Sequence, residues 1–375
     1  MSGPTRLALA AALAMASACG GAEGEPPGYV DLWAAMERAP ECVRRIQPHR
    51  EGRSCASGAY DRYEIRRISD VGARPVWSPD GTRIAYVDRH WGDAWEIDPE
   101  TGDERCLTCG FDHQGFWRVH YLRDGDFLLL GPQRFTSRLR SRLFGNGLFW
   151  MPADASAPPR WLGIEHFEGI AVSRESRRIA WATVFWNPWW SWPHALRVAE
   201  IAGDGEVRET RTVHRSRHVI EAQDFMPGDR GLVFARYTGG HDVVTLDFET
   251  GQVVNQTRDP HASEEPEGLF PDGVFTLMES DRHDPGDGEF DLDIYMLRLD
   301  GSGRDVRRLT HFNDSPDEKA TNPVVSPEGC RIAFMKGKRT DDRQELTGGS
   351  DGLFLLEFYE CADTAQLGGR VSGGR

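Results

Sequence analysis

Glutamates recur at similar intervals through the middle of the chain, and two of them have a histidine nearby. The glutamates are Glu168, Glu221 and Glu267, and the histidines are His166 and His218. Imidazole together with carboxylate suits Zn, Mn or Ni, whereas carboxylate with water suits Ca or Mg. If the fold brings these side chains together, they could hold a divalent ion. We single out His166, His218 and Glu221 as metal candidates.

A repeated unit sets these intervals. Its core is a short apolar strand, a tight turn and a second apolar strand, as in 75–81 followed by RIAYV and 323–329 followed by CRIAFM. Six such copies follow one another, and their Pro, Asp-Gly and Glu-Gly residues suit the turn. A second hairpin follows in several copies, for example at 94–102. Four antiparallel strands about every 50 residues predict one blade of a β-propeller.

We therefore predict an all-β fold, a six-bladed β-propeller of four-stranded antiparallel blades. The sixth unit ends after its third strand, at 353–358, and residues 63–69 look like a spare fourth strand. We expect 63–69 to complete the last blade and close the ring, which removes exposed sheet edges. The propeller would then span residues 63–361, and 362–375 would form a flexible C-terminal tail.

The first copy, PVWSPDGTRIAYV, resembles the TolB-type propeller repeat, with its P-x-W-S-P-D-G-x-x-I-A-[YF] core. The resemblance covers about residues 63–361. It implies a fold more than an activity, because the shared residues are turns and core. Some members of this family are periplasmic scaffolds. Others are lyases that act on acidic polysaccharides through a bound metal, or propellers fused to peptidases.

In such a ring the first strand of each blade is innermost and starts at the mouth of the central channel. The residues at or next to the six starts, here called the funnel residues, are Arg74, Arg118, Glu168, Glu221, Glu267 and Asn322. They are candidate ligand-binding residues. Without a metal, the two arginines would balance the glutamates in a solvated polar funnel. We expect no cofactor; the alternative is a divalent ion (Ca, Mn or Zn) at the funnel.

A tryptophan-rich stretch, VFWNPWWSWPH at 184–194, lies in a predicted loop between two strands of the third unit. Its tryptophans are Trp186, Trp189, Trp190 and Trp192. Exposed aromatic rings can stack on sugar rings or anchor a protein partner. The alternative is a lid that buries its own rings over the blade.

The N-terminus has the pattern of a secretory signal. Arg6 precedes a short apolar stretch and then small residues, which predicts a signal peptide at 1–18. Cys19 directly follows the small residues, and this junction resembles a bacterial lipobox, in which the new N-terminal cysteine carries lipid. Gly20 after the cysteine favours the outer membrane by the same resemblance. Residues 19–62 would then be a lipid-anchored tether and short N-terminal segment; a plain signal cut near Ala18 is the alternative.

Six cysteines remain if Cys19 is lipidated, and an even number in an exported chain suggests disulfides. Cys42 and Cys55 bracket a polar loop and most simply pair with each other. Cys330 and Cys361 flank antiparallel neighbours, so we expect a bridge between them. Cys106 and Cys109 form a CxxC at the end of a strand, where a local disulfide or two thiols are expected and an isolated pair makes a poor zinc site.

Composition limits the function classes. The 375 residues carry a formal net charge of −15, which argues against nucleic-acid binding. With 39% hydrophobic residues and no apolar run of membrane-spanning length, the chain meets the membrane only through its lipid anchor. Our main hypothesis is a monomeric binding or scaffold protein at the cell envelope. It would be an outer-membrane lipoprotein facing the periplasm or cell surface, with the interblade and second-to-third strand loops as its face for a protein or glycan. The alternative is a metal-dependent, lyase-like enzyme on acidic glycans, with its site at the funnel.

Overall fold

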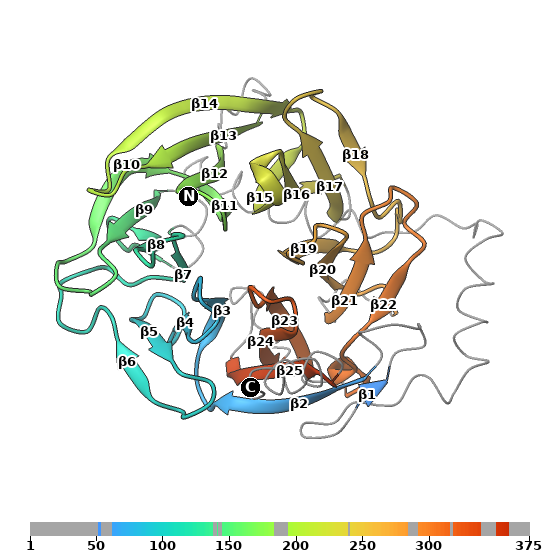
Figure 1. Cartoon of the computed structure of the whole chain (residues 1–375), viewed down its shortest axis with the longest axis horizontal. Helices are drawn as coiled ribbons and strands as arrows, with labels where there is room; N and C mark the ends of the chain where they lie inside the picture. Colours follow the sequence, from blue (N-terminus) through green and yellow to red (C-terminus); the bar gives the residue numbers. More distant parts are fainter. Residues whose placement is uncertain are drawn as a thin grey trace, which may run out of the picture.

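The computed structural model describes residues 52–53, 62–137, 141, 145–183, 194–238, 241–283, 292–315, 318–338 and 350–359. Over these residues the chain forms six antiparallel sheets, which are the blades of a closed ring (Figure 1). The predicted six-bladed β-propeller is thus confirmed. The predicted signal at 1–18, most of the segment 19–62 and the tail 362–375 lie outside the described residues.

In blades one to five the strands follow chain order from the innermost to the outermost strand (Figure 1). Blade one consists of β3 (Ala73–Trp77), β4 (Ile84–Val87), β5 (Ala94–Ile97) and β6 (Glu104–Cys106). Blade two consists of β7 (Arg118–Tyr121), β8 (Phe127–Pro132), β9 (Asn146–Met151) and β10 (Arg160–Glu165). Blade three consists of β11 (Phe167–Val172), β12 (Arg178–Thr183), β13 (His194–Ile201) and β14 (Val207–Ser216). Blade four consists of β15 (Val219–Phe225), β16 (Gly231–Tyr237), β17 (His241–Asp247) and β18 (Val253–Asn255). Blade five consists of β19 (Glu264–Leu269), β20 (Phe275–Ser280), β21 (Asp293–Arg298) and β22 (Val306–Arg308). Two 3-10 turns, η1 (Pro227–Asp229) and η2 (Phe312–Asp314), lie between strands.

The sixth blade takes its outer strand from the N-terminal side of the chain, as predicted. It consists of β23 (Glu318–Val325), β24 (Arg331–Lys338), β25 (Ser350–Phe358), β2 (Arg62–Ser69) and the short β1 (Gly52–Arg53). β2 pairs with β25, with Ile65 opposite Leu356. The buried Tyr63 donates a hydrogen bond to the carbonyl of Leu309 at 2.8 Å, just after β22. β2 therefore fastens blade six to blade five as well as closing the ring.

An Asp–Thr pair with a buried threonine holds the outer hairpin of two blades. In blade five, the Thr310 hydroxyl donates to Asp293 Oδ1 at 2.7 Å and accepts from the Ile294 N–H at 2.9 Å. Asp93 and Thr108 make the same hydroxyl–carboxylate bond in blade one, at 2.8 Å. Each pair satisfies polar groups that burial would otherwise leave without partners. The Leu-Thr dipeptide that recurs after the fourth strand is thus structural.

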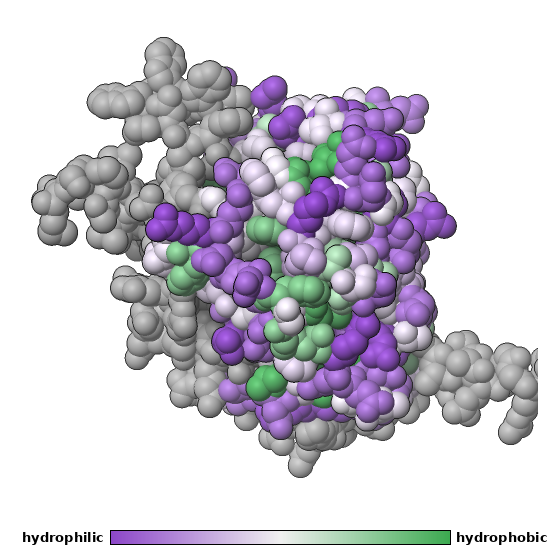
Figure 2. Space-filling model, turned by 90° about the vertical axis from the view of Figure 1, so that its left-hand side faces the viewer, coloured by the Kyte–Doolittle hydropathy of each residue, from purple (hydrophilic) through white to green (hydrophobic). Residues whose placement is uncertain are grey.

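Blades one and six also join through Trp77, from the repeated turn sequence. Its ring Nε1 donates to the carbonyl of Val324 at 3.2 Å, and the Arg331 guanidinium lies 4.4 Å from the ring centroid. On the side of the ring shown in Figure 2, the visible surface is mostly hydrophilic, with smaller apolar areas. Among the described residues, no helix is long and apolar enough to cross a membrane.

Candidate functional site

Four of the six funnel residues lie at irregular points of the innermost strands. A bulge or irregularity interrupts the pairing of the first two strands in blades one, three, four, five and six. Arg74, Glu168, Glu267 and Asn322 sit inside such interruptions. Arg74, Glu168 and Asn322 also have positive φ angles of 54°, 51° and 52°. Bulges re-aim side chains, and left-handed backbone at non-glycine residues is costly and clusters at functional sites.

Direct contacts join the funnel residues across blades. The Arg118 guanidinium lies 3.4 Å from the Glu267 carboxylate, and the Asn322 side-chain amide donates to the same carboxylate at 3.2 Å. These two contacts connect blades two, five and six. Glu221 accepts a hydrogen bond from the Gly169 N–H at 2.7 Å, which connects blades four and three. Polar contacts therefore cross from blade to blade at several points of the channel.

Both funnel arginines pack against the indole ring of Trp117. The guanidinium carbons of Arg74 and Arg118 lie 4.6 and 5.8 Å from its centroid. A guanidinium over an indole face gains from the ring's negative quadrupole. All six funnel residues are thus gathered and buried, including Glu168, whose charge acts on Glu221 and Arg118. Whether they bind a ligand stays a prediction.

Two further glutamates, Glu265 and Glu279, belong to this cluster and were not among the predicted residues. Glu279 accepts from the Asn322 side-chain amide at 3.2 Å, and Glu265 accepts from the Gln223 amide at 3.3 Å. The two glutamates are direct cross-strand partners in β19 and β20. Like charges at such positions destabilise a sheet. A glutamate in the apolar run of β20 was the available signal, but strand register was needed to interpret it.

Burial in this carboxylate cluster shifts proton affinities upward. Burial and then the Glu168 carboxylate raise the pKa of Glu221 to about 7, against the opposing effect of Arg118. Burial and then Glu267 raise the pKa of Glu279 to about 8. The pKa of Glu265 lies well above its usual range, because of burial and then Glu221. The cluster consequently retains protons near neutral pH.

Two histidines next to the funnel are held in the neutral form. Burial lowers the pKa of His166 to about 4, and burial followed by Arg118 lowers the pKa of His120 well below its usual range. His166 Nδ1 lies 3.0 Å from the carbonyl oxygen of Glu168 and can donate its proton there. The Nε2 atoms of both rings are buried and have no hydrogen-bond partner among the described residues. Neutral imidazole nitrogens of this kind are suited to bind a metal or a donor group of a ligand.

The predicted metal candidates do not form a preformed ligand set. His218 is exposed in the turn between β14 and β15, whereas His166 and Glu221 are buried. Within the described part of the chain, three His, Cys, Asp or Glu ligand atoms lie within 4.8 Å of one another only at Asp93, Cys106 and Cys109. Binding of a metal by His166, His218 and Glu221 stays a prediction.

A cavity of about 360 Å³ opens at the face of the first-to-second strand turns, and residues of all six blades line it. Funnel residue Glu267 lines this cavity together with His120 and Gln223. Trp77 and Phe270 contribute aromatic surface from blades one and five. The cavity and the carboxylate cluster are therefore two parts of one central channel. Sequence reasoning placed the ligand face at the opposite loops and did not find this cavity, because its volume depends on how six turns pack.

The disulfide predictions have different outcomes. Cys106 and Cys109 are disulfide-bonded, which confirms that pairing. Cys330 is also disulfide-bonded, and its partner lies outside the described residues, so the Cys330–Cys361 pairing stays a prediction. The following predicted residues lie outside the described residues as well: Cys19, Cys42, Cys55, Trp186, Trp189, Trp190 and Trp192.

The ring and its central channel place the chain in the class of six-bladed β-propellers. No protein-family model matches the sequence, and no curated protein matches it. Similar solved structures include regucalcin, a calcium-binding protein from Agrobacterium tumefaciens, with a TM-score of 0.51 and 10% identity over 84% of this chain and 95% of that one. TolB from Acinetobacter baumannii has a TM-score of 0.47 and 11% identity over 89% of this chain and 71% of that one. An oligogalacturonate lyase from Vibrio parahaemolyticus has a TM-score of 0.47 and 10% identity over 84% of this chain and 97% of that one. At these identities the likeness concerns the fold alone.

Proposed function

We propose that this chain is an exported, lipid-anchored β-propeller that acts as a binding or scaffold protein at the cell envelope and holds its ligand in the central channel. One observation carries the proposal: a cavity lined by all six blades reaches Glu267 of the buried carboxylate network. Concave sites with aromatic walls and a few convergent polar groups are typical of ligand pockets. On the loop face that the sequence favoured, the interblade loops are largely described, whereas most second-to-third strand loops lie wholly or partly outside the described residues. Ligand binding at this face stays a prediction.

The chemistry of the channel favours a partner with a basic group. Five buried or partly buried glutamates surround two arginines there, and the cavity walls include Trp77 and Phe270. Desolvated carboxylates gain most from a positively charged or hydrogen-bond-donating group. A segment of an envelope protein that carries a basic side chain fits best, and a glycan is the second class of ligand.

Export rests on two features of the chain. The signal-like residues 1–18 precede Cys19, and the Cys106–Cys109 disulfide is typical of an oxidising compartment. We propose the outer membrane as the site of the anchor, with the ring in the periplasm or at the cell surface.

Capture from envelope extracts tests the channel as the binding site. Immobilised mature protein, residues 19–375, is compared with Arg123→Glu at the cavity and with Arg215→Glu on β14 as the matched control. Both arginines are exposed, so neither charge reversal should unfold the ring. We expect Arg123→Glu to change the recovery of a specific partner at least several-fold and Arg215→Glu to leave it unchanged. Equal recovery by all three proteins would contradict the proposal.

The metal-dependent enzyme is the second candidate, because His166 presents a buried Nε2 without a partner among the described residues. The gathered residues do not form a preformed metal site, so we derive no catalytic step through an ion. Metal analysis of the oxidised protein and of the His166, His218 and Glu221 alanine variants tests this candidate. No bound metal, and no thermal shift with Mn, Zn or Ca, would exclude it. Bound metal would call for activity tests on uronic-acid polymers.

A further inference from the structure

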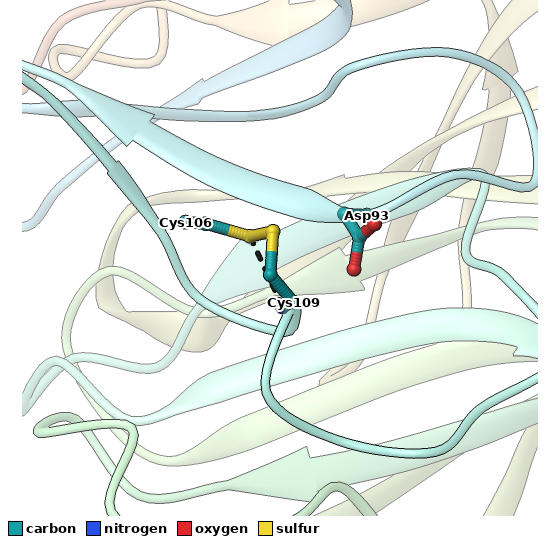
Figure 3. Close-up of side chains that lie close together, drawn as sticks. All are labelled: Asp93, Cys106 and Cys109. Carbon is teal, nitrogen blue, oxygen red and sulfur yellow. Dashed lines mark hydrogen bonds between the residues drawn. A yellow bond between two sulfur atoms is a disulfide. The ribbon is translucent and has the colours of Figure 1, made fainter.

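A separate cluster of metal-ligating side chains lies in blade one, where β5 begins and β6 ends. The sulfur atoms of Cys106 and Cys109 and a carboxylate oxygen of Asp93 all lie within 4.8 Å of one another (Figure 3). Zn²⁺ prefers thiolate, imidazole and carboxylate ligands in such compact groups. The Asp93 carboxylate adds a third ligand to the two sulfur atoms of the CxxC, which alone would make a poor zinc site.

The surroundings already support a thiolate and a fixed carboxylate. The Cys109 N–H donates to Cys106 Sγ at 3.0 Å, and a donor directed at sulfur favours the ionised form. Asp93 Oδ1 accepts from the Thr108 hydroxyl at 2.8 Å and lies 2.9 Å from His113 Nε2. These partners hold one carboxylate oxygen in place, as hydrogen bonds around metal ligands commonly do. Asp93 Oδ2 accepts no hydrogen bond from the described residues, and it remains for an ion.

The disulfide is accessible to reduction by an external thiol. Cys109 is exposed, so an external thiol can reach its sulfur. The two cysteines are three positions apart, and short loops gain the least stability from a cross-link. The ring is held by its sheets and by β2 instead, so reduction should leave the fold intact.

We propose that Cys106, Cys109 and Asp93 form a redox-controlled Zn²⁺ site. An external dithiol gives two electrons and two protons to the Cys106–Cys109 disulfide and becomes a disulfide itself. The two thiols then lose their protons as Zn²⁺ binds to both sulfurs and to the Asp93 carboxylate. A water molecule completes the tetrahedron. His113 is a positioning residue that orients Asp93.

Co²⁺ absorbance tests the site, because thiolate ligands give a charge-transfer band and a tetrahedral site gives strong visible bands. The mature protein is titrated with Co²⁺ in its oxidised form and after reduction. The Cys106→Ser/Cys109→Ser double variant, treated identically, measures any contribution from other cysteines. We expect one Co²⁺ with thiolate bands in the reduced wild type, displaced by Zn²⁺, and neither band in the oxidised protein or the double variant.

The carboxylate is tested by Asp93→Asn, which keeps an oxygen to accept from Thr108. We expect metal affinity to fall at least about tenfold while the thiolate bands remain. Thermal unfolding of each variant confirms that the ring is folded. The proposal is overturned if the reduced wild type and the double variant give the same spectrum. It is also overturned if Asp93→Asn binds Co²⁺ as tightly as the wild type.

Discussion

Glu265 and Glu279 face each other across β19 and β20, a position where two charges would repel. Protonation relieves this repulsion, and the raised pKa values of Glu221, Glu265 and Glu279 show how the channel tolerates so many carboxylates. A basic ligand that displaces these protons would bind more tightly as the pH rises. Ligand binding in the channel should therefore be pH-dependent around neutrality.

The stability of the free protein should depend on the same protons. A carboxyl group whose pKa is higher in the folded than in the unfolded chain stabilises fully at low pH, and its contribution is lost as the pH rises through the folded value. Burial raises the pKa of Glu279 to about 8, so its contribution falls between pH 7 and 8. His166 titrates at about 4 when folded, and its opposing effect is nearly complete below pH 7.

We predict that the free energy of unfolding of the wild type falls between pH 7 and 8 by about 1 kcal/mol more than that of Glu279→Gln. Denaturant unfolding at several pH values measures the difference. Glu249→Gln, at an exposed turn, is the matched control and should follow the wild type. If Glu279→Gln also follows the wild type, the proton on Glu279 is not part of the folded state.

At the scale of elements, the repeat was enough to predict the blades and the closing strand. Alternating apolar residues and recurrent turns fix where strands begin and which side is buried. The bulges at Arg74, Glu168 and Glu267 could not be predicted, because they depend on register between strands. The positions of Glu265 and Glu279 could not be predicted for the same reason. The cavity could not be predicted because it depends on how the six turns pack.

The closing strand β2 offers a direct test of how the ring is held. Ile65 is fully buried against the last blade, so Ile65→Ala removes apolar contacts and leaves a cavity. We predict a loss of about 2–5 kcal/mol in the free energy of unfolding, measured by denaturant titration. Glu64→Ala, on the exposed side of the same strand, should cost under about 0.5 kcal/mol. A similar small cost for both variants would mean that β2 does not close the ring.

At the scale of the whole molecule, the ring has two open faces with different candidate sites. The cavity opens among the first-to-second strand turns, including Pro79 and Pro327. The four tryptophans of 186–192 belong to the connection between β12 and β13, at the opposite end of the strands. Only one of these faces needs to bind the principal partner.

Deletion of residues 186–192 distinguishes partner binding at the cavity from partner binding at the tryptophan-rich loop. We predict that the shortened protein captures the channel partner within about twofold of the wild type, because the cavity is built from other segments. Quantitative capture together with thermal unfolding measures binding and stability in the same preparation. Loss of capture without loss of stability would assign the partner to the tryptophan-rich loop, as the sequence alone suggested.

Photo-crosslinking in cells tests the central claim most directly. A photoreactive amino acid replaces Arg123 at the cavity in one strain and Arg215 on the outer strand β14 in another. We predict a discrete adduct with one envelope component from position 123 and none of that adduct from position 215. Adducts of equal yield from both positions, or no adduct from position 123, would contradict a ligand site in the central channel.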